Sequence, residues 1–146
     1  MTIREQIVEE AMTFMKTPYH HKGMLKGIGV DCLSFIYLVY LNVGLIEKIE
    51  IPHYPPDFNL HDPSETYLEG ILNNTSAHEV SDPLPGDIVL YKFGKKYAHS
   101  ALVIKWPIVI HAVSGGCVQL EDASICGFLK QKNGVIREHK FLSMVE

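Results

Sequence analysis

Three side chains in this sequence have the chemistry and the order of a thiol nucleophile with imidazole partners: Cys32, His99 and His111. Cys32 follows Asp31, where a glycine-containing loop meets the apolar run CLSFIYLVYL. A cysteine in the first turn of a helix lies near unpaired backbone N–H groups and the positive end of the helix dipole, and both favour thiolate over thiol. The position makes Cys32 a candidate nucleophile; the alternative is a buried cysteine that only fills space.

The two histidines lie on predicted neighbouring strands. His99 begins the stretch HSALVIKW, His111 lies near the end of IVIHAV, and the dipeptide WP between them predicts a hairpin turn. Because both histidines are about equally far from Lys105, we expect them to be cross-strand neighbours. One imidazole would take the thiol proton and return it to the leaving group, while the other would fix the tautomer of the first.

Two helices are expected to precede the strands. Ile3, Ile7, Ala11 and Phe14 recur at helical spacing and predict a helix over residues 2–16, which the segment KTPY would end. A second helix is predicted from residue 32 to just before Gly44, buried on most sides because apolar residues cover nearly every face. Asp31 is interpreted as its capping group rather than as a catalytic acid.

The rest of the chain predicts a long connection and then a sheet. Residues 47–85 are rich in proline, with one helix expected over 64–74. Four short stretches rich in β-branched and aromatic residues follow, namely 87–93, 99–106, 108–113 and 116–122. Helices first and strands after predict a single α+β domain over 1–146, with the buried central helix packed on an antiparallel sheet.

Composition excludes several classes of function. The chain has 146 residues and a net charge of −4 without a lysine or arginine run, so we expect neither a nucleic acid nor an anionic membrane surface as partner. Its three cysteines show no CxxC spacing, and the remaining histidines form no ligand motif, so we expect no disulfide framework, metal or cofactor. The acidic N-terminus and the short apolar runs predict synthesis in a cytoplasm without a signal peptide or membrane insertion.

The sequence resembles the NlpC-type cysteine peptidases, papain-like enzymes of bacterial cell-wall turnover, and in particular their phage cell-wall peptidase branch. The resemblance extends from Thr17 to about Gln119 and rests on four segments in order: TPYHHKGMLKGIGVDCLSFIYLVY, LPGDIVLYKF, HSALVI and IVIHAV. A cysteine, then PGD before a strand, then two histidines twelve residues apart recur in this family as a set.

The resemblance implies roles for individual residues. Cys32 would be the nucleophile, His99 the general base and His111 the polar third member of a Cys-His-His triad, while Tyr19 would border the site and help to hold the oxyanion. The implied fold is papain-like, with the cysteine at the start of a central helix packed on the sheet that carries the histidines. Lys16 replaces the usual glycine before TPY, and HSALV replaces the commoner HVGIY. These differences leave the reacting groups in place.

The implied activity is hydrolysis of amide bonds in peptidoglycan stem peptides, typically between D-glutamate and the following diamino acid, without a cofactor. Two alternatives stay open. A thiol acyltransferase could use the same fold and thiol, and a binding or assembly module of a virion tail could carry a vestigial site.

Delivery to the wall is the last expectation. Because the sequence has no recognisable signal peptide, we expect a phage tail or similar particle to carry the protein to peptidoglycan. The proline-rich segment IPHYPPDF would then be a docking surface for particle proteins, a lid over the cleft or simply a packed loop.

Overall fold

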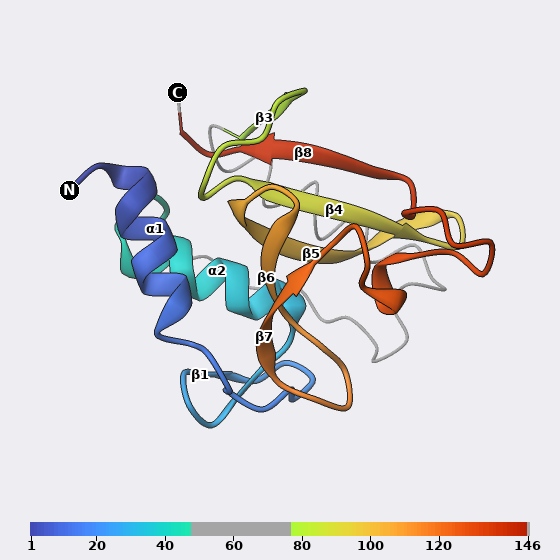
Figure 1. Cartoon of the computed structure of the whole chain (residues 1–146). Helices are drawn as coiled ribbons and strands as arrows, with labels where there is room; N and C mark the ends of the chain where they lie inside the picture. The colour runs from blue at the N-terminus through green and yellow to red at the C-terminus, as the bar shows by residue number, and fades with distance from the viewer. Residues whose placement is uncertain (48–76, 146) are drawn as a thin grey trace.

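Two helices pack beside a six-stranded antiparallel sheet in the computed structural model, which describes residues 1–47 and 77–145 (Figure 1). The helices are α1 (Ile3–Met12) and α2 (Cys32–Asn42), and α1 packs on α2, which packs on the sheet. The sheet has the strand order β3-β8-β4-β5-β6-β7. Its strands are β3 (His78–Val80), β4 (Ile88–Phe93), β5 (Lys96–Lys105), β6 (Ile108–Ala112), β7 (Val118–Asp122) and β8 (His139–Ser143). The expected α+β architecture is therefore confirmed.

Helix α1 begins where the sequence predicts and ends four residues earlier. Thr2 caps it. The Thr2 side chain accepts from the backbone N–H of Glu5, and the Glu5 side chain accepts from the backbone N–H of Thr2. The predicted end at Lys16 is wrong because the chain leaves the helix to pair with the start of β7. The Lys16 N–H donates to the Val118 carbonyl at 2.8 Å, with Lys16 at a φ of 69°.

Helix α2 agrees closely with its prediction. Asp31 is the N-cap, accepting from the backbone N–H groups of Leu33 and Ser34 while the Ser34 hydroxyl accepts from the N–H of Asp31. The helix ends just before Gly44, whose φ of 81° is a conformation that glycine adopts without strain. Most of its side chains are buried, so α2 is the central helix that its composition predicts.

The four predicted strands are confirmed as β4, β5, β6 and β7, although β5 begins three residues earlier than expected. The prediction missed β3 and β8, as well as the small hairpin of β1 (Met24–Leu25) and β2 (Gly29–Val30) that leads into α2. Strand β8 pairs with both β3 and β4, a partnership between distant segments that local composition does not reveal. The helix predicted over 64–74 and the segment IPHYPPDF lie outside the described residues.

The turn before β4 joins both helices to the sheet. Asp87, almost fully buried, accepts from Arg4 of α1 at 2.8 Å and from the Leu84 N–H at 2.8 Å. The Tyr40 hydroxyl of α2 donates to the Gly86 carbonyl at 2.6 Å. The segment PGD therefore has a structural role here.

Alternation along the strands divides the core into two layers. Ile88 and Leu90 face the cluster that contains α1 and α2, whereas Val89 and Tyr91 face a second cluster on the other side of the sheet. A short 3-10 helix, η2 (Gly127–Leu129), contributes Leu129 to this second cluster. None of the helices in the described part of the chain has the length and apolar character needed to span a bilayer.

Replacing Asp87 with alanine should destabilise the fold. The change leaves Arg4 and the Leu84 N–H without their buried acceptor, and because Arg4 is partly exposed we expect a loss of about 3 kcal/mol in the free energy of unfolding. Urea denaturation measures this loss. Asp82→Ala, at an exposed position of the same connection, is the control and should change stability by less than about 0.5 kcal/mol. Equal effects of the two substitutions would contradict a structural role for Asp87.

Candidate active site

The first turn of α2 is fixed against β5 at Cys32. The Ser100 hydroxyl donates to the backbone carbonyl of Cys32 at 3.1 Å, and the Cys32 thiol donates to the Ala98 carbonyl at 4.0 Å. Only 3% of Cys32 is exposed. The candidate nucleophile thus lies beside the backbone that precedes His99.

A β-bulge adjoins His99. Tyr91 pairs with His99 and the next residue of β4, Lys92, pairs with Tyr97, so that Ala98 is an extra residue on β5. Bulges bend a strand and change the direction of the side chains beside them. The irregularity therefore falls on the residues that connect the thiol to the first histidine.

The two histidines form a hydrogen-bonded pair, with His99 Nε2 and His111 Nδ1 at 2.8 Å. Both are buried. The expectation that they are neighbours is confirmed, but the expectation that they stand directly opposite is wrong. Leu102 pairs with Ile110, and the register shifts between Val103 and Lys105, so the histidines are diagonal neighbours on one face.

Aromatic rings surround the His99 imidazole. The Phe128 ring centroid lies 5.0 Å from it, that of Phe93 lies at 6.0 Å and that of Tyr91 at 6.2 Å. Phe128 belongs to η2, and nothing in its local sequence marked it as part of the site. These rings restrict the orientation of His99 and keep water from its edge.

Burial decides the charge state of the site. It raises the pKa of Cys32 to about 12, with a further increase from the Asp31 carboxylate that outweighs the hydrogen bonds favouring thiolate. Burial likewise lowers the pKa of His99 well below its usual value and that of His111 to about 4. The helix start predicted a thiolate, but the tertiary environment favours a neutral thiol beside neutral imidazoles.

The thiol donates to the Ala98 carbonyl and is within hydrogen-bonding reach of Ser100, and among the described residues no bond joins it to an imidazole nitrogen. The structure thus brings His99 and His111 together, and brings Cys32 to the backbone next to His99. Because Nε2 of His99 is occupied by His111, Nδ1 is the nitrogen that remains for the thiol.

Tyr19 lies close to the candidate nucleophile. Burial raises its pKa, and Cys32 and Asp31 raise it further, which places its hydroxyl within electrostatic reach of both. Its backbone forms a bridge to Val30 and donates to the Gly116 carbonyl at 2.9 Å. The expected position beside the site is thus consistent with the structure, and the hydroxyl stays protonated as a hydrogen-bond donor.

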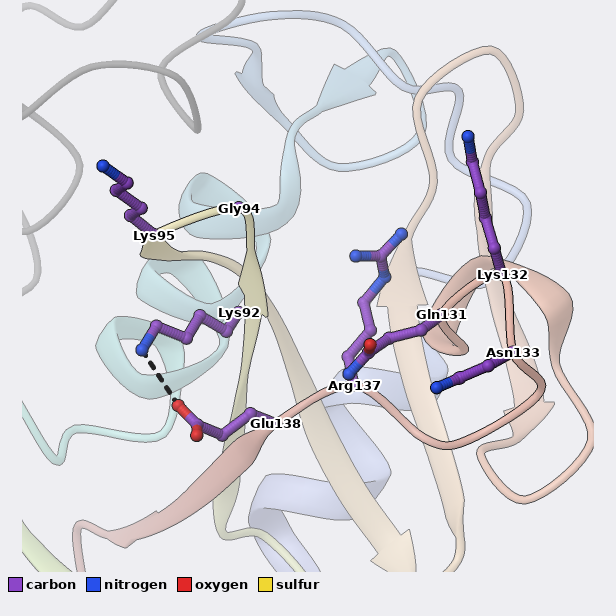
Figure 2. Close-up of a pocket in the computed structure, with 8 residues that line it drawn as sticks. All are labelled: Lys92, Gly94, Lys95, Gln131, Lys132, Asn133, Arg137 and Glu138. Carbon is purple, nitrogen blue, oxygen red and sulfur yellow. Dashed lines mark ion pairs between the residues drawn. The ribbon is translucent and has the colours of Figure 1, made fainter.

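A pocket of about 750 Å³ is lined by the end of β4 with the turn after it and by the segment before β8. Figure 2 shows the Lys92–Glu138 ion pair, at 3.0 Å, at one end of the pocket. The Arg137 guanidinium lies 3.8 Å from the Phe93 ring centroid and helps to lower the pKa of His99. Cations dominate the lining: Lys92, Gly94, Lys95, Gln131, Lys132, Asn133, Arg137 and Glu138. The pocket suits an anionic group bound near the histidines.

A second group of potential ligands includes His111. One ligand atom each from His111, Glu121 and Cys126 lie within 4.8 Å of one another. These residues come from β6, from β7 and from the turn after β7, so no short sequence motif contains them. This grouping was missed in the sequence, where a metal site was not expected.

Comparisons with known proteins agree on one family and fold. A family model described as NlpC/P60 family matches residues 16–137. The NlpC/p60 domain of the peptidoglycan hydrolase SagA is 23% identical, with 82% of this chain and 88% of that chain covered and a TM-score of 0.57. An NlpC/P60 family protein from Bacillus cereus is 16% identical, with 98% of this chain and 40% of that chain covered and a TM-score of 0.64.

An N-acetylmuramoyl-L-alanine amidase from Bacteroides uniformis is 13% identical, with 99% of each chain covered and a TM-score of 0.63. This chain therefore spans nearly all of one similar structure and 40% of another. No curated protein sequence matches it. The structural likeness confirms the papain-like fold expected from the sequence.

The charge state of Cys32 can be tested by alkylation. Because the thiol pKa is raised to about 12, labelling by iodoacetamide should keep accelerating as pH rises above neutrality, without a plateau below about pH 9. Asp31→Asn keeps a capping oxygen but removes the carboxylate that raises this pKa, so it should speed labelling at a fixed pH.

Mass spectrometry of digested protein follows Cys32, with Cys117 in the same molecule as the internal reference. A labelling rate for Cys32 that is already constant below neutral pH would contradict a neutral resting thiol.

Proposed function

This chain belongs to the NlpC/P60 family of peptidoglycan hydrolases, and from this premise we propose that it is a cysteine peptidase or amidase acting on peptidoglycan stem peptides. The observation that carries the proposal is the hydrogen-bonded pair of His99 on β5 and His111 on β6, since β5 is the strand against which Cys32 is fixed. A thiol, a base and a partner that orients the base are the groups that nucleophilic acyl transfer requires.

The reaction would begin from neutral groups. In the tautomer that this reaction needs, the N–H at Nε2 of His99 would donate to Nδ1 of His111, which would leave Nδ1 of His99 as a proton acceptor. Rotation about the Cα–Cβ bond of Cys32 would release the thiol from the Ala98 carbonyl and turn it toward this nitrogen. Sulfur would attack the amide carbonyl as its proton passes to His99, so no thiolate has to exist beforehand.

The proton then returns to the leaving group. Imidazolium at His99 would protonate the amine as the C–N bond breaks, leaving a thioester on Cys32. A water molecule, losing its proton to His99, would hydrolyse the thioester and restore the thiol. The backbone N–H of Cys32 and the protonated Tyr19 hydroxyl would donate to the oxyanion in both halves of the reaction.

The cationic pocket supports an acidic substrate. Stem peptides carry carboxylates, and Arg137 and Lys132 in this pocket would attract one of them while the amide lies at Cys32. This arrangement is compatible with cleavage between D-glutamate and the following diamino acid, which is the finer proposal that the resemblance suggests.

One observation favours a second candidate function. The thiol bonds to the Ala98 carbonyl instead of an imidazole nitrogen, as it would in a binding or assembly module with a vestigial site. A third possibility, acyl transfer, differs only in the nucleophile that resolves the thioester. Product analysis distinguishes all three, because a vestigial site gives no product and acyl transfer gives a new amide or ester in place of a free carboxylate.

Purified peptidoglycan should be cleaved by the protein, with fragments whose masses identify the bond. Cys32→Ala and His99→Ala should each reduce the rate by about 10³-fold or more, because each removes a group that reacts. His111→Ala should cost less, and His111→Gln, which keeps an acceptor for the His99 N–H, should retain more activity than His111→Ala.

Cys117→Ser is the matched control, since this thiol lies outside the triad, and it should keep the full rate. Activity in His99→Ala together with loss in His111→Ala would show that the two histidine roles are reversed. Full activity in Cys32→Ala would rule out the thiol mechanism.

Association with a phage tail is a separate proposal, which the sequence resemblance alone supports; none of the three structures named above is described as a phage protein. If a tail carries this hydrolase to the wall, mass spectrometry should find the chain in purified particles at a fixed ratio to tail proteins. Absence from particles, together with efficient lysis by the free protein, would contradict delivery by a tail.

A further inference from the structure

The second ring nitrogen of His111 is a buried polar atom without a partner. His111 is fully buried, its Nδ1 bonds to His99, and its Nε2 has no hydrogen-bond partner. A buried polar atom of this kind costs free energy unless a partner, an ion or a water satisfies it. This nitrogen is not needed for the hydrogen bond that orients His99, so it is available to another ligand.

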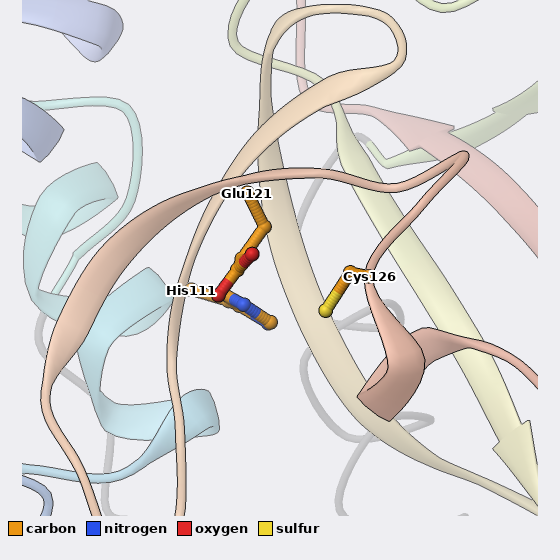
Figure 3. Close-up of side chains that lie close together, drawn as sticks. All are labelled: His111, Glu121 and Cys126. Carbon is orange, nitrogen blue, oxygen red and sulfur yellow. The ribbon is translucent and has the colours of Figure 1, made fainter.

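Metal-binding groups lie beside the His111 ring, and because Nδ1 already bonds to His99, Nε2 is the nitrogen left for an ion. Glu121 and Cys126 contribute a carboxylate oxygen and a sulfur, and the three ligand atoms lie within 4.8 Å of one another. Figure 3 shows the Glu121 carboxylate against the His111 ring and the Cys126 sulfur pointing toward the same space. Glu121 and Cys126 are only partly buried, so an ion can enter from solvent and both side chains can adjust.

A simple hydrogen bond does not explain the arrangement. The Glu121 carboxylate accepts from Gln119, while Nε2 of His111 makes no bond to it. A second buried polar atom, the Tyr91 hydroxyl, is also without a partner, and Cys126 contributes to the raised pKa of Tyr91, which places the two residues near each other. Two residues near Cys126, His111 and Tyr91, therefore each have an unsatisfied polar atom.

We propose that His111, Glu121 and Cys126 bind a divalent metal ion of the zinc type, with water completing its coordination, and that the bound ion switches off the histidine pair. Imidazole nitrogen, carboxylate oxygen and thiolate sulfur are the ligands that zinc takes, at about 2.0–2.3 Å. Ligand atoms in a tetrahedral site are about 3.5 Å apart, so side-chain movements of about 1 Å would close the site.

Inhibition follows from the tautomers, and this half of the inference rests on the proposed function. A metal at Nε2 of His111 uses the lone pair there, so the proton of that ring must be on Nδ1. Nδ1–H then donates to Nε2 of His99, and the proton of His99 must be on its Nδ1, the nitrogen meant for the thiol. His99 can no longer act as base. Each imidazole keeps one proton, and the Cys126 thiol releases its own to solvent.

Metal binding can be measured without any activity. In Cys32→Ala/Cys117→Ser protein, where Cys126 is the remaining thiol, titration with Co²⁺ should give thiolate-to-cobalt absorption that saturates at one equivalent. Adding Cys126→Ser should abolish the absorption, and adding Glu121→Gln should weaken binding by about tenfold or more. The unmodified chain provides a test that does not depend on a variant folding. In it, zinc should slow alkylation of Cys126 and leave the alkylation rate of Cys117 unchanged.

Inhibition is tested by the zinc concentration that halves peptidoglycan cleavage. Each protein's rate is compared with its own rate without zinc. Halving the rate of Cys126→Ser should then require at least about tenfold more zinc than halving that of the unmodified protein, whereas the control Cys117→Ser should match the unmodified protein. Equal zinc sensitivity of Cys126→Ser and the unmodified protein would overturn the inhibitory role, because the ion would then act at Cys32. Absence of both cobalt absorption and alkylation protection would overturn the site. If these binding signals appear but zinc-free protein does not cleave peptidoglycan, the metal site stands and the proposed function fails.

Discussion

The contact between the first turn of α2 and strand β5 is the constraint on which the candidate site depends. The Asp31 carboxylate starts the helix at Cys32, and the Ser100 hydroxyl holds the Cys32 carbonyl to the strand. Because His99 directly precedes Ser100 in β5, the hydrogen bond that fixes the backbone of Cys32 also fixes the backbone beside His99, the proposed base. The turn before β4, with its buried Asp87, supports this arrangement by joining both helices to the sheet.

Burial fixes the side chains of the site in place and also determines their charge. The interior that holds Cys32 and the two histidines disfavours thiolate and imidazolium alike, so the groups rest as a neutral set. In the proposed reaction charge would develop only as the thiol attacks, when the Cys32 N–H and the Tyr19 hydroxyl would stabilise it. This order of events suits a peptidase whose thiol would otherwise be open to oxidation between turnovers.

His111 connects the proposed catalysis to the proposed regulation through the two nitrogens of one ring. Nδ1 bonds to His99 and Nε2 has no partner, while Glu121 and Cys126 lie beside the ring, so a ligand at one nitrogen dictates the proton at the other. An imidazole as the third member of the triad offers this coupling, because its proton can be on either ring nitrogen. An amide side chain at position 111 could orient His99 but could not move a proton in this way.

The sequence by itself determined the parts that depend on local pattern. Helical spacing, the Asp31 cap, four of the strands and the order of Cys32, His99 and His111 are all encoded within short segments, where residue type acts directly on backbone and chemistry. Tertiary structure decided what depends on distant partners: the pairing of β8, the diagonal register of the histidines and the neutral state of the thiol. It also decided that Glu121 and Cys126 lie beside the His111 ring. Burial and strand register are properties of the assembled sheet, so no single segment contains them.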